Sequence, residues 1–147
     1  MSLVPVNMPE HAHVPGQNKR HADDAFDALR ATAVVGHDVD QLARCDAFRA
    51  GLLYLDQGYY WEAHEVLEAV WMILPDKSIE KRFVQGIIQL ANGRLKVRMG
   101  RLKAARRLVG LARGLIPSES AVTIMELDVQ VVLNRIDTLE QEINLAI

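Results

Sequence analysis

From residue 21 onward, apolar side chains recur at spacings of three and four residues, which is the period of an α-helix. The pattern predicts helices over about residues 24–33, 40–56, 60–74, 79–99, 101–115 and 129–146. Gly58 and Gly100 each follow the end of a predicted helix, where a left-handed C-cap favours glycine. No segment shows the strict alternation of a strand, and residues 116–125 are expected to form a loop or a short extended piece. The expected fold class is therefore all-α.

A weak internal repeat suggests how these helices are joined. Gly58 corresponds to Gly100 and Ala63 to Ala105, at a spacing of 42 residues in both cases. In each copy a helix ends in glycine, a second helix begins at once, and a small residue follows where the two would cross. This arrangement is typical of tetratricopeptide-like hairpins, but two copies are too few for a free-standing solenoid. We therefore expect a single-domain bundle of about six helices built from such hairpins.

The first 20 residues differ from the rest of the chain. They contain Pro5, Pro9, Pro15 and Gly16 and show no apolar periodicity. Such a composition favours an extended arm or a flexible tail. The expected organisation is an N-terminal arm over residues 1–20 and a helical bundle domain over residues 21–147.

Composition narrows the class of protein without indicating a reaction. The chain has 147 residues, of which 50% are apolar and 24% charged, and its formal net charge is -2. These values are ordinary for one soluble globular domain. Cys45 is the only cysteine, which excludes an intramolecular disulfide and a cysteine-based zinc site. No apolar run is long enough for a membrane span and the N-terminus has no signal-like apolar stretch, so we expect a soluble cytoplasmic protein.

The predicted helix over residues 60–74 has an unusual polar face. An advance of about 100° per residue brings together Trp61, His64, Glu68 and Trp71, with Glu65 at the edge of this face. A histidine and a carboxylate four residues apart share one side of a helix. This face is therefore large, aromatic and ionisable at once, and it is the first candidate site.

The next predicted helix, over residues 79–99, carries a second polar stripe. Gln85, Gln89, Asn92 and Lys96 fall close together on the helical wheel, and the rest of the helix is mostly apolar. A helix that is apolar nearly all round is buried, so the stripe is expected inside the protein or in a cleft. If the two helices are antiparallel, their polar stripes can face each other.

These two stripes allow several interpretations. Buried polar groups must be hydrogen-bonded, so His64, Glu68, Gln85 and Gln89 are expected to form a network that fixes the helix register. A ligand cleft lined by Trp61, Trp71 and the four polar residues of the second stripe is the next interpretation. A hydrolytic site would use His64 as general base, oriented by Glu68, with Glu65 as a further candidate.

A metal site is not expected, and no cofactor is predicted. One helix supplies a single histidine to the candidate face, and a His-x-x-x-His pair is absent from it. The opposite stripe offers amides and Lys96, whose ammonium group would repel a cation and would rather pair with Glu65 or Glu68. His21, in the arm, is the only obvious histidine that could assist His64.

Residues 94–113 form a basic segment with eight lysines or arginines and no acid. Such a segment can mark a nucleic-acid surface, but it contains no aromatic residue on which a base could stack. After residue 113 the chain has six acids and one base. We therefore favour pairing of the basic face with acidic helices of the same chain or of a second subunit, and nucleic acid and membrane are not expected partners.

Two motifs carry a resemblance to a known family. The segments GYYWEAHEVLEAVW and RFVQGIIQLANGRLKVRMG resemble the signature of the small all-helical family called domain of unknown function 309. The arm segment VPGQNKRH also resembles an N-terminal segment of some members. The clear resemblance covers about residues 48–112. It implies an all-helical bundle and implies no reaction.

The leading functional hypothesis is a non-catalytic module that binds an unknown small molecule or protein partner, with the His/Glu/Gln network between its central helices. A small hydrolase-type enzyme using His64 and Glu68 is the first alternative. A nucleic-acid accessory protein using the basic face of residues 94–113 is the second. Homo-oligomerisation remains open.

Overall fold

The computed structural model describes residues 7–118 and 122–147. The helices and strands in these residues follow one another in the order α1 (Asp27–Arg30), α2 (Val39–Arg44), α3 (Asp46–Gln57), α4 (Tyr60–Ile73), α5 (Ile79–Arg98), α6 (Leu102–Leu115), β1 (Thr123–Ile124), β2 (Leu127–Asp128) and α7 (Val129–Ala146). The two short strands pair antiparallel with each other. The expectation of an all-α fold is confirmed, and none of the helices described here is long and apolar enough to cross a membrane.

Two helical hairpins with the same turn form the centre of the fold. Gly58 joins α3 to α4 and Gly100 joins α5 to α6, at positive φ angles of 87° and 75°. In each turn the next residue donates its backbone N–H five residues back, from Tyr59 to Tyr54 and from Arg101 to Lys96. Glycine populates this left-handed region without a Cβ clash. The repeat seen in the sequence therefore corresponds to two hairpins with the same backbone geometry at the turn.

Close helix packing depends on a second pair of glycines, one between α3 and α4 and one between α5 and α7. A Cβ atom at Gly51 of α3 would lie 2.4 Å from the side chain of Leu67 in α4. A Cβ atom at Gly93 of α5 would lie 2.9 Å from the side chain of Leu139, which belongs to α7. Both positions admit only hydrogen, so these glycines set how near the neighbouring helices approach.

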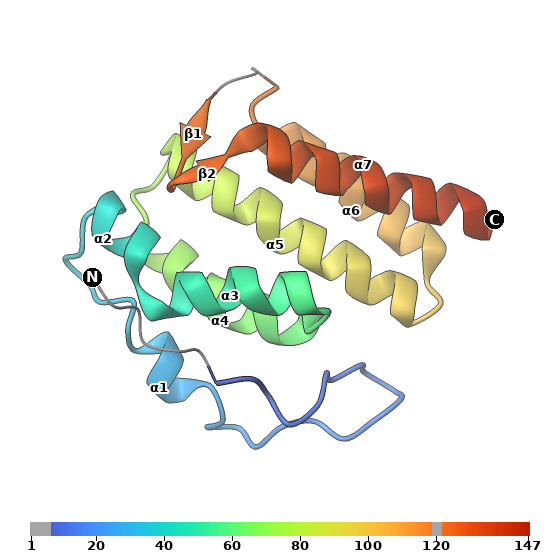
Figure 1. Cartoon of the computed structure of the whole chain (residues 1–147), viewed down its shortest axis with the longest axis horizontal. Coiled ribbons are helices and arrows are strands. Elements are labelled where there is room, and N and C mark those ends of the chain that lie inside the picture. The colour runs from blue at the N-terminus through green and yellow to red at the C-terminus, as the bar shows by residue number, and fades with distance from the viewer. Residues whose placement is uncertain (1–6, 119–121) are drawn as a thin grey trace.

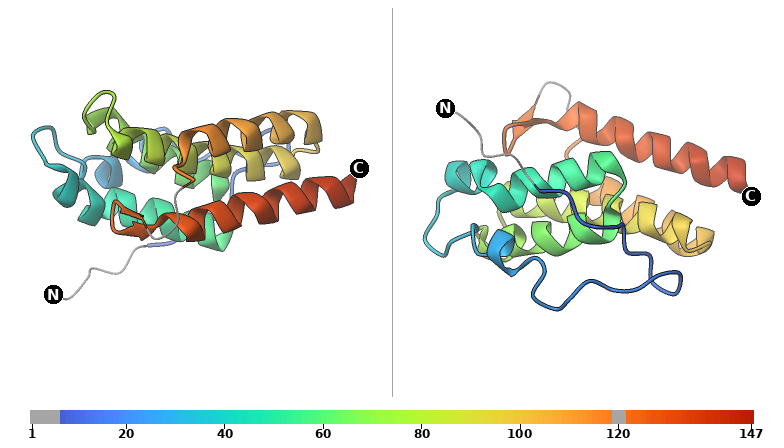
Figure 2. Two further views of the ribbon diagram at one scale, coloured as in Figure 1. Left: turned by 90° about the horizontal axis from the view of Figure 1, so that it is seen from above. Right: turned by 60° about the horizontal axis from the view of Figure 1, so that its bottom comes forward.

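The helices stack in a continuous series around one core. Figures 1 and 2 show α5 between the α3–α4 hairpin and the pair formed by α6 and α7. The N-terminal arm and α1 cover α3 and α4 at the opposite end from α7. Leu42, Phe48, Leu67, Phe83 and Ile136 are among the largest fully buried side chains of this core.

The predicted helix over residues 40–56 is in fact two helices. Cys45 interrupts it with an extended backbone at φ -70° and ψ 156°. The hydroxyl of Thr32 accepts a hydrogen bond of 2.8 Å from the backbone N–H of Ala47, in the first turn of α3. A side chain from a distant segment thus caps α3, which no local pattern in the sequence could indicate.

The first predicted helix, over residues 24–33, is shorter than expected. Only Asp27–Arg30 are α-helical, and the flanking residues form turns. The Thr32 hydroxyl donates to the Leu29 carbonyl at 2.7 Å. Threonine side chains that bond nearby backbone groups compete with continued helix formation, which accounts for the early end.

Candidate functional site

The N-terminal arm contains a tight turn that lies inside a small closed loop. Gln17 donates its backbone N–H to the carbonyl of Val14 at 3.0 Å. Pro15 and Gly16 occupy the two central positions, and Gly16 has a φ of 82°. Proline followed by a residue with positive φ is the signature of a type II turn. The proline and glycine of segment Val14–Gln17 therefore favour the reversal of chain direction that the structure shows there.

Asn18 holds the two sides of this loop together. Its Oδ1 accepts the backbone N–H of Val14 at 2.9 Å and lies 3.1 Å from Nδ1 of His13. Its Nδ2 donates to the carbonyl of Ala12 at 2.9 Å. One amide side chain thus satisfies three groups of the arm, which gives the loop internal order.

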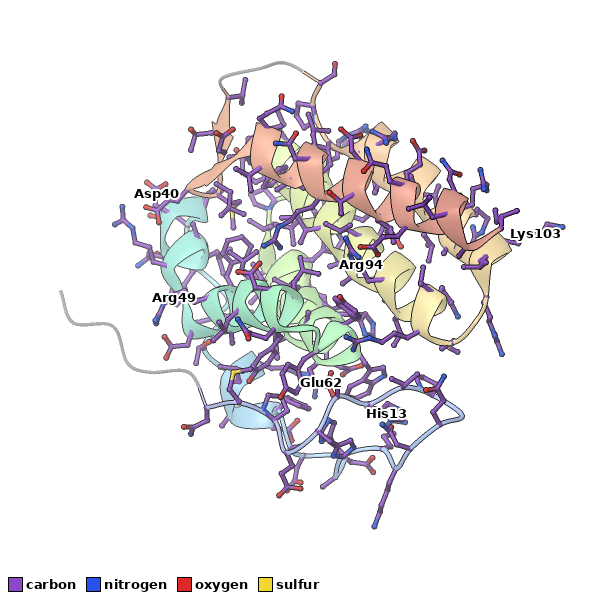
Figure 3. The ribbon with its side chains drawn as sticks, turned by 45° about the vertical axis from the view of Figure 1, so that its right-hand side comes forward. His13, Asp40, Arg49, Glu62, Arg94 and Lys103 are labelled. Carbon is purple, nitrogen blue, oxygen red and sulfur yellow. The ribbon has the colours of Figure 1, made fainter. Side chains whose placement is uncertain are left out.

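Glu62 fixes the arm to the helical bundle. Its Oε2 accepts the backbone N–H of His13 at 2.8 Å and lies 2.6 Å from Nε2 of His21. Glu62 is fully buried in α4, and Figure 3 shows its side chain directed toward the arm that carries His13. A buried carboxylate is costly unless it is paired and hydrogen-bonded. The arm therefore supplies the partners that make this buried charge tolerable.

The other carboxylate oxygen of Glu62 is different. Oε1 is buried and has no hydrogen-bond partner among the described residues. A buried acceptor without a donor adds to the free-energy cost of burying the carboxylate. The two hydrogen bonds at Oε2 therefore have to offset this cost.

Aromatic rings surround the neighbouring residue Trp61. His13 meets its indole edge-on with 5.0 Å between ring centroids, and the rings of His21 and Phe26 lie 5.9 and 6.2 Å away. The Arg20 guanidinium lies 5.5 Å from the Trp61 ring centroid, within the range of a cation–π contact. Trp61, a predicted binding residue, is thus part of the surface on which the arm packs.

A cavity of about 700 Å³ opens between the arm, α1 and α3. The arm lines it with two segments, residues 7–11 and 19–22, which we call its two legs. Its polar lining residues are Asn7, Glu10, His11, Lys19, Arg20, His21, Thr32, Asp46 and Tyr54. Its apolar lining residues are Met8, Pro9, Ala22, Ala25, Phe26, Ala28 and Leu29.

The cavity combines fixed walls with available polar groups. Phe26 and Tyr54 are buried, and the Tyr54 hydroxyl donates to the Asn7 carbonyl at 3.0 Å. Burial raises the pKa of the Tyr54 hydroxyl, and the nearby charge of Glu62 raises it further. His11 stacks on His21 with 4.4 Å between ring centroids. Within residues 7–118 and 122–147, no group of three or more His, Cys, Asp or Glu side chains is arranged to hold a metal ion.

The predicted catalytic residues lie outside this cavity. Nε2 of His64 is 3.2 Å from a carboxylate oxygen of Glu68, and the two side chains are 25% and 52% exposed. Glu65 is paired with Arg30 of α1, and its other carboxylate oxygen lies 3.7 Å from Nδ1 of His64. His64 and Glu68 thus form a partly exposed pair on one helix, where such contacts contribute little to stability.

The remaining predicted binding residues are partly buried along α4 and α5. The ammonium group of Lys81 lies 4.4 Å from the ring centroid of Trp71. Within the described residues, no hydrogen bond connects His64 or Glu68 to the polar stripe on α5, which consists of Gln85, Gln89, Asn92 and Lys96. Among the described residues, the ion pairs of His64 are with Glu65 and Glu68, within α4 itself.

Three residues of the basic segment contact α7, namely Arg94, Arg106 and Arg113. Arg94 pairs with Glu142, and Arg113 lies 2.8 Å from a carboxylate oxygen of Asp137. Glu140 also accepts a hydrogen bond from Arg113. The hydrogen bond to Asp137 raises the pKa of the Arg113 guanidinium, and the charges of Glu140 and Asp137 raise it further. These contacts link the basic helices to the acidic C-terminal helix of the same chain.

Sequence reasoning missed Glu62 and the roles of His11, His13 and His21. A signal for Glu62 was present, because it shares one helical face with Val66 and Ala69 at spacings of four and seven residues. A carboxylate within an apolar stripe indicates a buried charge that needs a partner. The histidines could not be assigned in this way, because the arm has no periodicity and reaches α4 only through tertiary contacts.

The fold and site together define a small all-helical protein with an N-terminal arm held on a buried glutamate. Residues 48–108 match the family described as Domain of unknown function (DUF309), which confirms the resemblance drawn from the two motifs. No curated protein and no solved structure gives a significant match to the chain. The matched segment includes Glu62 and both hairpin turns; it begins after the arm and ends before α7.

Proposed function

We propose that this chain is a non-catalytic module that binds a small molecule in the cavity between the N-terminal arm and α1. The cavity itself carries this proposal. Its volume of about 700 Å³ lies within the usual range of roughly 300–1,000 Å³ for small-molecule sites. It also has the usual composition of such sites, with an apolar wall and a few polar groups that converge from separate segments.

The anchoring of the arm supports the same proposal. His21 and His13 contact the buried Glu62, so the two legs of the arm are held at a defined separation. A site that is preformed loses less conformational entropy when its ligand binds. The arm thus forms a wall of the cavity as well as a cover for α4.

The geometry gives less support to the two alternatives. His64 and Glu68, the residues of the hydrolase hypothesis, do not line the cavity, and Glu68 is exposed. In the basic segment, Arg94 and Arg113 are already paired with carboxylates of α7. Fewer cations therefore remain for phosphate contacts, which dominate nucleic-acid affinity.

A binding screen with matched variants tests the proposal. The probe is a library of soluble fragments, detected by ligand-observed NMR with the full chain. Ala28 is exposed and lines the cavity, whereas Ala31 is exposed, lies just beyond α1 and does not line it. Ala28→Trp should remove binding of most fragments that bind the wild type, because the indole fills part of the cavity. Ala31→Trp introduces the same side chain three residues away and should leave binding unchanged.

The proposal fails if the wild type binds no fragment, or if Ala28→Trp binds the same fragments as Ala31→Trp. Circular dichroism of both variants controls for folding. Equal helical content with selective loss in Ala28→Trp is the supporting result.

A further inference from the structure

Hydrogen bonds fix the tautomers of two histidines in the cavity. Nε2 of His11 lies 2.6 Å from the carbonyl oxygen of Lys19, and Nε2 of His21 lies 2.6 Å from the carboxylate of Glu62. Carbonyl and carboxylate oxygens only accept, so each Nε2 carries a hydrogen. The neutral rings therefore present a lone pair at Nδ1.

These two Nδ1 atoms are available to a ligand. Neither has a hydrogen-bond partner among the described residues, and neither is a buried atom without a partner, so both are reachable from the solvent side. Both residues line the cavity. An imidazole that carries its hydrogen on Nε2 offers Nδ1 as an acceptor, so His11 and His21 present two acceptor positions for hydrogen-bond donors such as hydroxyl groups.

Cationic groups lie beside these acceptors. Lys19 and Arg20 line the same cavity, and neither is paired with a carboxylate in the described part of the chain. Of the two lining acids, Asp46 is paired with Arg49 at 2.9 Å, which leaves Glu10 as the opposing charge. An anionic group is therefore favoured next to Lys19 and Arg20.

A ligand that is only an anion would leave these acceptors without a donor. An anionic oxygen placed against the lone pairs of His11 and His21 would be repelled, so that part of the cavity needs a donor. Phe26 and Leu29 add an apolar wall suited to a carbon skeleton that joins the two polar parts.

We infer that the ligand of this cavity is a small organic phosphate or carboxylate that also carries hydroxyl groups. Its anionic group lies against Lys19 and Arg20, and its hydroxyl groups donate to Nδ1 of His11 and His21. This inference rests on the proposed function and specifies the chemistry that the cavity recognises.

Calorimetric titrations of the full chain with small probes test the inference. Ribose 5-phosphate and gluconate each combine an anion with hydroxyl groups, whereas ribose, inorganic phosphate and acetate each present one part alone. At least one of the two combined probes should bind about tenfold or more tightly than every single-part probe, because one charge-assisted hydrogen bond contributes about that factor.

Two variants separate the contributions. Lys19→Gln should weaken the tighter combined probe about fivefold or more and leave ribose unchanged. His11→Phe keeps an aromatic ring against His21 but removes the acceptor, so it should weaken the combined probe and leave inorganic phosphate unchanged. Lys103→Gln is the control, since Lys103 does not line the cavity and stands well apart from Glu62, at the edge of the molecule in Figure 3.

Each outcome is decisive. The inference is overturned if neither combined probe binds more tightly than its parts, or if Lys19→Gln behaves like Lys103→Gln. If the fragment screen still shows loss of binding in Ala28→Trp, the cavity remains a ligand site and only the assigned ligand class is wrong. If Ala28→Trp has no effect on any compound, the proposed function fails as well.

Discussion

Replacing Glu62 by alanine should release the N-terminal arm from the bundle. The carboxylate accepts the backbone N–H of His13 and the Nε2–H of His21 within a buried environment. Alanine removes the acceptor of both donors. The contact that holds the arm across α4 would then be lost.

The magnitude follows from the number of donors left without a partner. Each buried donor that loses its acceptor costs about 1–3 kcal/mol, so the two together cost about 2–6 kcal/mol. Removing a buried charge with one unpartnered oxygen, Glu62 Oε1, offsets part of this loss. We therefore expect the closed arm to be destabilised by about 3 kcal/mol, which shifts its opening equilibrium about 100-fold.

Hydrogen exchange at the amide of Val14 measures this shift. Val14 is buried, and its N–H donates to the side chain of Asn18, an acceptor that the Glu62→Ala variant retains. Exchange about 100-fold faster at Val14, with smaller changes in α5, would show that the arm opens as a local unit. Unchanged exchange at Val14 would refute the role of Glu62 as the anchor.

Glu68→Ala provides the matched control on the same helix. Glu68 is 52% exposed, and the one ion pair it makes among the described residues is with His64. Loss of such a surface pair costs at most about 0.5 kcal/mol. A Glu68→Ala variant that loosened the arm as much as Glu62→Ala would show that both variants act through general destabilisation of α4.

Four further substitutions test the packing and the titration of the fold. Gly51→Ala should destabilise the protein by about 1–3 kcal/mol in urea unfolding, because the new Cβ would lie 2.4 Å from Leu67, whereas Gly110→Ala, which has open space, should stabilise it by up to about 1 kcal/mol. Thr32→Ala should cost about 1 kcal/mol in the same assay, since it removes the cap of α3, and a change near zero would contradict that role. Because the pKa of Tyr54 is raised in the folded state, its contribution to stability is present below the unfolded pKa of 10.0 and is lost as pH rises through the folded pKa. Tyr54→Phe should therefore lose less stability than the wild type between pH 9 and roughly 12. Identical alkaline unfolding curves would contradict the raised pKa.

The helical part of the fold could be predicted well because its signals are local. The turn glycines Gly58 and Gly100, and the 42-residue spacing between them, are visible in the sequence and define the two hairpins. The break at Cys45 could not be predicted, because the hydroxyl that caps α3 comes from Thr32 in another segment. Local patterns therefore indicate the helices, and tertiary contacts decide where one of them is divided.

The candidate site was harder to predict for a related reason. The helical wheel drew attention to His64 and Glu68, which stand on the same face, although the structure leaves them partly exposed. Glu62 sits one position from the core residue Ala63, and its importance depends on two arm residues more than 40 positions away in the sequence. Periodicity describes one helix at a time, so it could not show that the arm folds back to meet this carboxylate.

A crystal structure of the full chain with the tightest-binding compound from the fragment screen tests the central claim most directly. The account predicts density for that compound between the two legs of the arm, in contact with His11, Arg20 and Phe26, with the contacts of Glu62 to His13 and His21 preserved. Density for the compound against the exposed face of α4 at His64 and an empty arm cavity would contradict it.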